Sequence, residues 1–285
     1  MKFILDMIRG AVIGIANIIP GVSGGTMMVT MGIYDKLLGA ITGIFKQFKK
    51  SIKTLFPYFV GMVAGIGAFA FLLTKVLLVK FPLPTAFAFI GLIVGGVPVL
   101  VKKAKEAGRT GIFPCILVFG LFFALIIGLQ FLGEGAERDV TPSLLNVLIL
   151  MVMGVLSAAA MVVPGVSGSL LLLAFGYYNP VTGAVTDFIS AVFDMNFAGM
   201  LEKALVLFPF GVGVLLGIFF VAKLIEWLLE HHKRLTYCGI LGLVCASPVP
   251  VFFNALGGVV NAGAVIASVV TFSAGFAAAM VMGRE

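Results

Sequence analysis

Charged residues are scarce in this sequence: Asp, Glu, Lys and Arg together make up 11% of its 285 residues. A soluble domain usually carries about 25% of these residues. Hydrophobic residues account for 61%, and the mean hydropathy is +1.20. A chain with so few charges cannot cover itself with a water-facing surface, which excludes an ordinary soluble protein. The composition predicts an all-α polytopic membrane protein.

Histidine and cysteine are also scarce. The two histidines, His231 and His232, are adjacent in a basic stretch, and the three cysteines form no Cys-x-x-Cys pair. An odd number of cysteines without that spacing indicates neither a disulfide framework nor a metal site. The sequence therefore offers few residues for a metal-ligand cluster or for histidine-based catalysis. We predict no metal ligand and no catalytic residue.

Long apolar runs are abundant, and a helix that spans a bilayer needs about 20 mainly apolar residues. Six stretches meet this standard: 55–79, 85–101, 111–132, 204–229, 236–253 and 259–282. Two further apolar stretches, about 3–41 and 146–178, are each interrupted by a glycine-rich motif. Proline ends a helix and glycine permits a sharp reversal. We therefore predict each of these two stretches to be a re-entrant hairpin, with a helix, a turn and a second helix.

The two interrupted stretches resemble each other. Residues 10–41 and 154–185 align without gaps and share eleven identities in 32 positions. Downstream, "FPYFVGMVAGI" (56–66) resembles "FPFGVGVLLGI" (208–218). A shared PGVSG motif in register with flanking glycines is hard to obtain from membrane composition alone. The sequence therefore predicts two copies of one unit.

The predicted units are residues 1–140 and 141–285, each with one re-entrant hairpin and three transmembrane helices. A hairpin that enters and leaves on one side adds no crossing, so each unit crosses the membrane an odd number of times. The second unit must then be upside down relative to the first. Such inverted-topology repeats are typical of alternating-access transporters.

Charge predicts the orientation. With the N-terminus in the cytoplasm, the inside segments hold 15 of the 19 Lys and Arg residues and 6 of the 12 Asp and Glu residues. The positive-inside rule therefore predicts a multi-pass protein with both termini cytoplasmic. The stretch 36–55, which follows the first hairpin, is amphipathic and rich in lysine. It suits an interfacial helix on an anionic cytoplasmic leaflet, whereas its counterpart, 186–203, is acidic and predicted to lie outside.

The two glycine-rich motifs predict an anion site. Non-helical backbone at membrane depth must be buried in protein or line a polar cavity. The helix that follows each motif presents free N–H groups and the positive end of its dipole. We expect the two tips to meet near the bilayer midplane and to hold an anionic group there. The candidate binding residues are Gly21, Val22, Ser23, Gly24, Gly25 and Thr26 in the first motif, and Gly165, Val166, Ser167, Gly168 and Ser169 in the second.

Two other interpretations of the motifs remain open. Small residues also let helices approach closely, so each motif could be a packing turn. The Gly-x-Ser-Gly form also occurs at the nucleophile of intramembrane serine proteases, which need a base beside the serine. His231 and His232 lie at a helix end in a charged run, which is a poor position from which to reach a midplane serine.

The roles of three basic residues are also open. Arg9 is either a positive-inside anchor or a phosphate ligand near the cytoplasmic mouth, and Asp6, three residues earlier, lies on the same helical face and could pair with it. Lys75 and Lys223 lie near span ends and are expected to extend their amines toward the interface, although either could meet a headgroup.

The motifs carry a family resemblance. "NIIPGVSGGT" (17–26), "VVPGVSGS" (162–169), and "GIYDKL" matched by "GYYNPV" resemble the bacterial and archaeal polyprenyl-phosphate transporter family, the PopT-type undecaprenyl-phosphate translocases. The resemblance runs along essentially the whole chain, and the doubled motif is specific. The second copy has Ser169-Leu170 where the first has Gly25-Thr26, so the two tips need not bind phosphate equally.

The resemblance implies a flippase of the prokaryotic cytoplasmic membrane. Such a protein returns undecaprenyl or polyprenyl phosphate from the outer to the inner leaflet for peptidoglycan and other envelope synthesis. It implies the lipid and a bilayer with anionic lipids as partners, no nucleic acid and no cofactor, and it predicts no oligomeric state. A secondary transporter for a small soluble anion on the same scaffold is the alternative.

Movement of the lipid phosphate toward the cytoplasm has an energetic cost. Moving an anion toward a negative cytoplasm costs about 2.3 kcal/mol per charge per 100 mV. Accumulation on that side needs protonation of the phosphate, a co-transported cation, or consumption of the lipid by synthesis. We expect coupling to protons or to another cation.

Overall fold

The computed structural model describes residues 2–19, 22–108, 111–256 and 261–283, and these residues form helices and connecting loops with no strand. Seven helical segments are long and apolar enough to cross a membrane. They are Phe48–Lys80, Pro82–Glu106, Ile112–Phe131, Leu144–Val162, Phe197–His231, Lys233–Ala255 and Ala262–Met282. The predicted all-α membrane class is confirmed.

Six of these segments correspond to the six predicted spans. The predicted boundaries are mostly too narrow, since 85–101 extends to Pro82–Glu106 and 204–229 to Phe197–His231. Both helices continue through an internal proline. Residues 259 and 260 of the last predicted span lie outside the described residues. The seventh segment, Leu144–Val162, comes from the stretch predicted as the second hairpin and ends where its motif begins.

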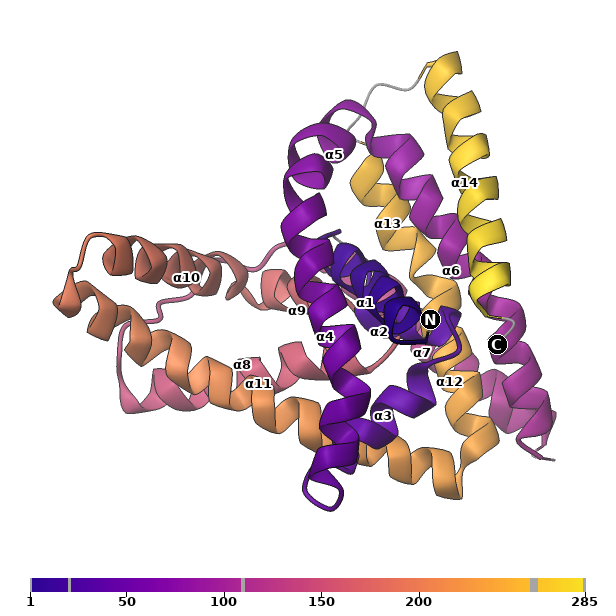
Figure 1. The fold of residues 1–285 in the computed structure, drawn as a ribbon, viewed down its shortest axis with the longest axis horizontal. Coiled ribbons are helices and arrows are strands. Elements are labelled where there is room, and N and C mark those ends of the chain that lie inside the picture. The colour runs from indigo at the N-terminus through magenta and orange to yellow at the C-terminus, as the bar shows by residue number, and fades with distance from the viewer. Residues whose placement is uncertain (1, 20–21, 109–110, 257–260, 284–285) are drawn as a thin grey trace.

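The helix breaks at the two motifs are confirmed (Figure 1). Helix α1 (Lys2–Ile18) ends before the first motif, and the short α2 (Gly24–Thr30) begins within it. Helix α8 (Leu144–Val162) ends before the second motif, and α9 (Gly168–Phe175) begins within it. A serine precedes each second helix, and Ser23 caps α2 by accepting a hydrogen bond from the Gly25 N–H. Serine is a preferred N-cap residue, which explains why the new helix starts there.

The stretch 36–55 is not the single interfacial helix that its amphipathic pattern predicts. Helix α3 (Tyr34–Thr42) ends at Gly43, and α4 (Phe48–Phe71) begins after Gln47, so a turn separates them. A π-helical segment, Leu72–Leu77, and α5 (Leu78–Lys80) continue α4. The counterpart in the second half breaks similarly, between α10 (Tyr178–Phe193) and α11 (Phe197–His231). Glycine has poor helix propensity, and Gly43 permits the first of these breaks.

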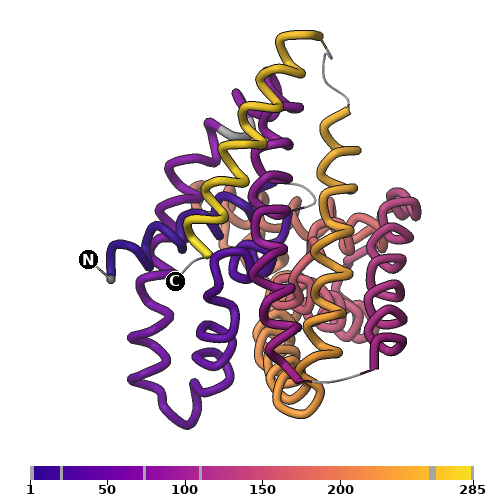
Figure 2. The backbone as a smooth tube through the Cα atoms, turned by 90° about the vertical axis from the view of Figure 1, so that its right-hand side faces the viewer, coloured from indigo at the N-terminus to yellow at the C-terminus, as the bar shows by residue number. Residues whose placement is uncertain are grey.

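The remaining helices are α6 (Pro82–Glu106), α7 (Ile112–Phe131), α12 (Lys233–Ala246), α13 (Pro248–Ala255) and α14 (Ala262–Met282). They include two packed pairs, and α13 lies against α6. Helix α6 lies beside α14 at the right of Figure 1, and α7 lies beside α12, as Figure 2 also shows. Helix α1 packs on α4, and α8 packs on α11. The first and second halves of the chain are thus joined through exchanged helix pairs.

Glycines set the closest helix approaches at matching positions of the two halves. A Cβ atom on any of four glycines would overlap a backbone carbonyl of the facing helix. They are Gly10 against Tyr58 and Gly61 against Met7 in the first pair, and Gly154 against Phe210 and Gly213 against Met151 in the second. All four glycines, and the partners Tyr58 and Phe210, correspond in the two alignments, and Met7 and Met151 continue the first alignment at the same offset. Small residues of this kind let membrane helices pack closely.

Three of the segments predicted to be cytoplasmic lie at one end of the molecule, at the bottom of Figure 1; they are 35–53, the described part of 102–110, and 223–234. Lys103 on α6 donates to Asp35 on α3 at 2.6 Å. Arg234 on α12 donates to the Gly108 carbonyl at 2.9 Å. These bonds join the three segments directly.

Substitution of Gly213 tests the packing of α8 on α11. We expect Gly213→Leu to lower the thermal unfolding midpoint in detergent, since its side chain would overlap the Met151 backbone and overpacking costs about 1–3 kcal/mol. Gly211→Leu is the matched control, because a Cβ at Gly211 meets no atom within 4 Å. Equal midpoints for the two variants would contradict this packing.

Candidate functional site

The two glycine-rich motifs contact each other. The Gly165 N–H of the second motif donates to the Thr26 hydroxyl of the first at 2.7 Å. The Ser23 hydroxyl donates to the Ala160 carbonyl at the end of α8 at 3.3 Å. Beside them, the Tyr34 hydroxyl donates to the Val162 carbonyl at 3.0 Å. Hydrogen bonds across more than 120 residues thus bring the predicted tips together, and we call this contact the motif junction.

The first motif is closed in this conformation. Val22, Ser23, Gly24, Gly25 and Thr26 are all buried, with Thr26 at 0% exposure. The Gly24 N–H donates to the Asn17 side-chain oxygen at 2.9 Å, and the Gly25 N–H donates to the Ser23 hydroxyl at 3.2 Å. The chain's own oxygens therefore occupy donors that were predicted to hold an anion. Gly21 lies outside the described residues.

The second motif is more open. Val166 and Ser167 are buried, but Gly168 and Ser169 are partly exposed. The Ser167 and Ser169 hydroxyl oxygens lie 2.8 Å apart and share a hydrogen bond. Ser169 lines a cavity of about 360 Å³. Among the described residues of the two motifs, only residues of the second motif line this cavity.

This cavity also has polar walls from three other segments. Gln130 at the end of α7, Glu134 in the following loop and Asn254 on α13 line it together with Ser169. Within the described residues the Gln130 Oε1 atom is buried and has no hydrogen-bond partner. A buried acceptor of this kind favours a ligand that brings a proton or another donor.

Gly165 can only be glycine in this backbone. Its φ angle is +88°, in the left-handed region, and a Cβ built on it would lie 2.5 Å from the Leu243 carbonyl carbon. Left-handed backbone strongly favours glycine. The backbone of the second motif therefore lies closer to α12 than any side chain at position 165 would allow.

Arg9 and Asp6 pair with each other, as their spacing predicts, at 3.6 Å. The Asp6 carboxylate also accepts hydrogen bonds from the Tyr58 hydroxyl at 2.6 Å and from the Lys36 amine at 3.0 Å. Asp6 is 6% and Arg9 8% exposed, so Arg9 lies in a buried ionic cluster and not at an exposed anchor position. The sequence spacing indicated the Arg9 pair, but it gave no indication of Tyr58 or Lys36.

Lys36 is held as a cation. Burial by itself would lower the pKa of Lys36, but its hydrogen bonds with Tyr58 and Asp6 outweigh that effect, and the pKa is raised overall. The amine donates to the Tyr58 hydroxyl at 2.8 Å and lies over the Tyr58 ring. The charge on Lys36 is thus directed from α3 toward α4.

Removal of the Asp6 charge tests the buried cluster. We expect Asp6→Asn to lower the free energy of unfolding by about 3 kcal/mol, because breaking a buried ion pair leaves an uncompensated charge. Asp187→Asn is the control, since Asp187 pairs with Lys203 while 59% exposed, and surface pairs contribute about 0–1 kcal/mol. Chemical denaturation in mixed micelles measures both. Similar losses for the two variants would argue against a buried ionic role for Asp6.

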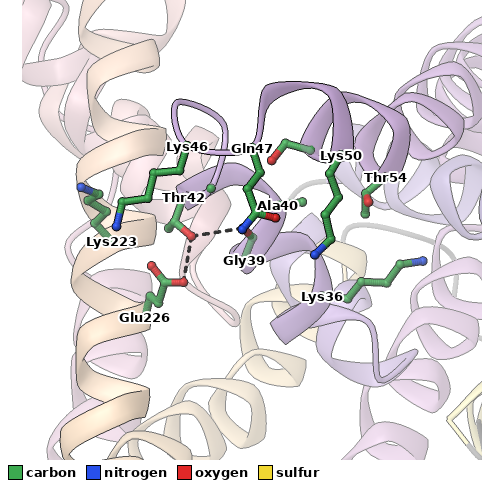
Figure 3. Close-up of a pocket in the computed structure, with 12 residues that line it drawn as sticks. Lys36, Gly39, Ala40, Thr42, Lys46, Gln47, Lys50, Thr54, Lys223 and Glu226 are labelled. Carbon is green, nitrogen blue, oxygen red and sulfur yellow. Dashed lines mark hydrogen bonds between the residues drawn. The ribbon is translucent and has the colours of Figure 1, made fainter.

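A second cavity, of about 490 Å³, lies between α3, the start of α4 and α11 (Figure 3). The sequence predicts that Lys36, Lys46 and Lys50 lie on an interfacial helix and that Lys223 reaches the membrane interface. The turn between α3 and α4 instead brings Lys46 and Lys50 into the same cavity as Lys223. Lys75 is exposed and lines neither cavity. The cavity residues are Lys36, Gly39, Ala40, Thr42, Gly43, Lys46, Gln47, Lys50, Ser51, Thr54, Lys223 and Glu226.

The histidines do not support hydrolytic chemistry at the motif serines. His231 is exposed, lies 2.9 Å from the Trp227 carbonyl and stacks on the Trp227 ring. The hydrogen bonds found for Ser23 and Ser167 in the described part of the chain involve backbone groups and Ser169, and none involves a histidine. The base that a serine nucleophile requires is absent from these contacts.

Comparisons with known proteins agree with the sequence motifs. Residues 13–256 match the model of a family described as undecaprenyl phosphate translocase-like. The chain is 34% identical over 283 residues to a polyprenyl-phosphate transporter of Staphylococcus aureus, covering 98% of this chain and 96% of the relative. It is 30% identical over 258 residues to a polyprenyl-phosphate transporter of Vibrio cholerae, covering 86% and 76%. No solved structure matches. The chain is a member of the undecaprenyl phosphate translocase-like family.

Proposed function

We propose that this protein carries polyprenyl phosphate across the cytoplasmic membrane of a prokaryote, from the outer to the inner leaflet. Family membership and the names of both bacterial relatives, which are polyprenyl-phosphate transporters, support the substrate class. The observation that carries the proposal is the hydrogen bond between Thr26 and Gly165, which joins the two motifs of the family resemblance. The protein acts as a transporter and makes no covalent intermediate with the lipid.

The phosphate headgroup binds at the motif junction. Desolvation of a charged phosphate in hydrocarbon is the barrier that a translocase must lower. Backbone N–H groups and the hydroxyls of Ser23, Thr26, Ser167 and Ser169 supply donors that can replace water. Because the first motif is closed here, we infer that headgroup entry begins at Ser169 and that the Thr26–Gly165 bond opens as the headgroup advances. The polyprenyl tail stays in the bilayer.

The two halves act as inverted repeats, and each motif is the tip of a re-entrant hairpin. The matching glycine contacts of α1 with α4 and of α8 with α11 support the repeat. The exchanged pairs, α6 with α14 and α7 with α12, support a symmetric relation between the halves. The excess of Lys and Arg in the predicted inside segments supports cytoplasmic termini and contact with anionic lipids.

Coupling to protons or to another cation supplies the free energy that movement of the anion toward the cytoplasm requires. A protonated phosphate carries less charge against the membrane potential and also offers an O–H donor. The unpartnered Gln130 oxygen beside Ser169 supports this idea, since it can accept that hydrogen bond. Transport that is indifferent to both the pH gradient and the membrane potential would overturn the coupling.

A leaflet-resolved assay in proteoliposomes tests the proposed function. Labelled polyprenyl phosphate is placed in the outer leaflet, and the fraction protected from an impermeant phosphatase is followed with time. We expect protein-dependent protection of the lipid and no uptake of inorganic phosphate by the same vesicles. Uptake of inorganic phosphate without lipid movement would favour a small-anion transporter and contradict the proposal.

A further inference from the structure

The cavity of about 490 Å³ between α3, α4 and α11 is strongly basic. Four lysines, Lys36, Lys46, Lys50 and Lys223, line it together with the single carboxylate of Glu226. In Figure 3, Lys46 and Lys223 lie on one side of the cavity, and Lys36 and Lys50 lie on the other. Two of these lysines have a partner in the structure, an ion pair for Lys36 and an aromatic ring for Lys223.

Within the described residues, Lys46 and Lys50 are the two lysines of the lining that have neither an ion pair nor an aromatic ring beside the amine. Lys36 is paired with Asp6, and Lys223 lies over the Phe219 ring beside Glu226. Among the lining residues, four lysines against Glu226 leave three positive charges, and the Asp6 carboxylate that pairs with Lys36 also pairs with Arg9. A phosphate monoester carries about −1.5 to −2 charges at neutral pH, so the lysines of the lining can balance the charge of one phosphate group.

Neutral donors complete the lining. Ser51 and Thr54 supply hydroxyls, and Gln47 supplies an amide. The Thr42 hydroxyl donates to Glu226 at 2.9 Å, which holds that carboxylate against the α3 wall. Phosphate oxygens prefer such a mixture of ammonium and hydroxyl donors. A metal cation would instead require a set of carboxylates, and Glu226 is the one carboxylate in the lining.

Apolar side chains next to the cavity favour a ligand that comes from the bilayer. Phe45 in the turn is 81% exposed, and Phe48 is 64% exposed. Phe45 also packs edge to face on Phe219 of α11, with the ring centroids 5.0 Å apart. Exposed aromatic rings are typical of membrane interfaces. A lipid tail beside these rings can remain in hydrocarbon while its headgroup enters the cavity.

We propose that this lysine-lined cavity is a second phosphate site, which receives the phosphate headgroup of a lipid at the end of the molecule that carries the predicted cytoplasmic segments. The assignment of a polyprenyl phosphate rests on the proposed function, whereas the recognition of a phosphate group does not. The cavity shares no residue with the motif junction. It therefore offers the headgroup a place to dock after it leaves the junction.

Site-resolved lysine protection tests the proposal in the full-length protein. An amine-reactive reagent modifies the lysines of protein in nanodiscs, and mass spectrometry follows each residue. At a ligand concentration of about ten times Kd, we expect polyprenyl phosphate to slow modification of Lys46 and Lys50 about tenfold. Lys49 and Lys53 are internal controls, because they lie in the same segment but do not line the cavity. Their rates should remain unchanged.

The other ligands distinguish the sources of phosphate. Polyprenol without phosphate should protect none of these lysines, and inorganic phosphate should protect Lys46 and Lys50 only at much higher concentration. Protection by inorganic phosphate that equals that of the lipid would overturn the lipid assignment. Equal protection of all four lysines, or of none, would overturn the site. The assay does not depend on transport, so its outcome is separate from that of the leaflet assay.

Charge removal provides an independent check. Lys223 lines the same cavity, so polyprenyl phosphate should protect it as well. Lys46→Gln/Lys50→Gln should abolish this protection, while Lys49→Gln/Lys53→Gln, which removes the same total charge, should preserve it. Retained protection of Lys223 in the first double variant would contradict the assignment of Lys46 and Lys50 to the phosphate site.

Discussion

Gly165→Val is expected to lower the rate of polyprenyl phosphate movement by at least about tenfold, a loss of ~1.4 kcal/mol or more. Gly165 has a φ of +88°, and a side chain there would meet the Leu243 backbone. A β-branched residue disfavours left-handed backbone, and the overlap cannot be relieved by a rotamer change. The second motif would therefore shift relative to α12 and to Thr26.

A matched glycine controls for the general effect of valine. Gly183 lies on α10 and is exposed, and a Cβ atom there would meet no other atom within 4 Å, so Gly183→Val should transport at the wild-type rate. If Gly165→Val does not fold, Gly165→Ala provides a smaller perturbation whose thermal midpoint and transport rate can both be measured. Wild-type transport by folded Gly165→Ala and Gly165→Val would contradict the role of this backbone position.

Thr26→Val is expected to reduce transport and stability together. The Thr26 hydroxyl accepts the Gly165 N–H at 2.7 Å and is fully buried, so valine leaves a buried donor without its acceptor. An unsatisfied buried donor costs about 1–3 kcal/mol, which corresponds to about 5- to 150-fold in the population of the joined state. Valine has nearly the same shape as threonine, so packing changes contribute little.

Thr26→Ser is the rescue variant, because serine keeps the hydroxyl and loses only a methyl group. We expect its transport rate to lie near that of the wild type, well above that of Thr26→Val, in the same proteoliposome assay. If both variants transport alike, the lost methyl or the local packing matters more than the hydrogen bond, and the junction would not limit transport.

The sequence predicted the motif breaks because proline and glycine act locally. The PGVSG motifs contain their own helix-stopping residues and an N-cap serine, and the breaks occur at Ile18–Gly24 and Val162–Gly168. The repeat also predicted which glycines occupy equivalent positions. It could not predict what they contact, because the approach of Gly61 to Met7 depends on how two distant helices pack.

The basic cavity was not predictable, because it arises from a break that the amphipathic pattern hides. Residues 36–55 have a continuous apolar face, so helical periodicity predicts one helix. Gly43 ends that helix, and the resulting turn directs Lys46 and Lys50 toward Lys223, more than 170 residues away in the sequence. Lysines predicted to face an anionic membrane surface thus line one cavity.

The closed first motif shows that the local sequence does not predict whether the N–H groups at a helix start are free. Free N–H groups at a helix start favour an anion, but Asn17 and Ser23 satisfy those of Gly24 and Gly25 in this conformation. Asn17 lies ahead of the PGVSG motif, so its role as an acceptor is not evident from that motif. The difference between Gly25-Thr26 and Ser169-Leu170 did indicate that the two motifs are unequal. That inequality agrees with a transport cycle in which the headgroup meets the second motif first.

Photocrosslinking tests most directly whether the headgroup binds at the motif junction. The probe is a polyprenyl phosphate with a photoreactive group on the isoprene unit next to the phosphate, used with the full-length protein in nanodiscs. We predict labelled peptides from residues 16–30 and 160–171, with labelling suppressed by unlabelled polyprenyl phosphate and lost in Gly165→Val. Competable labelling confined to other helices, with neither motif labelled, would contradict the account.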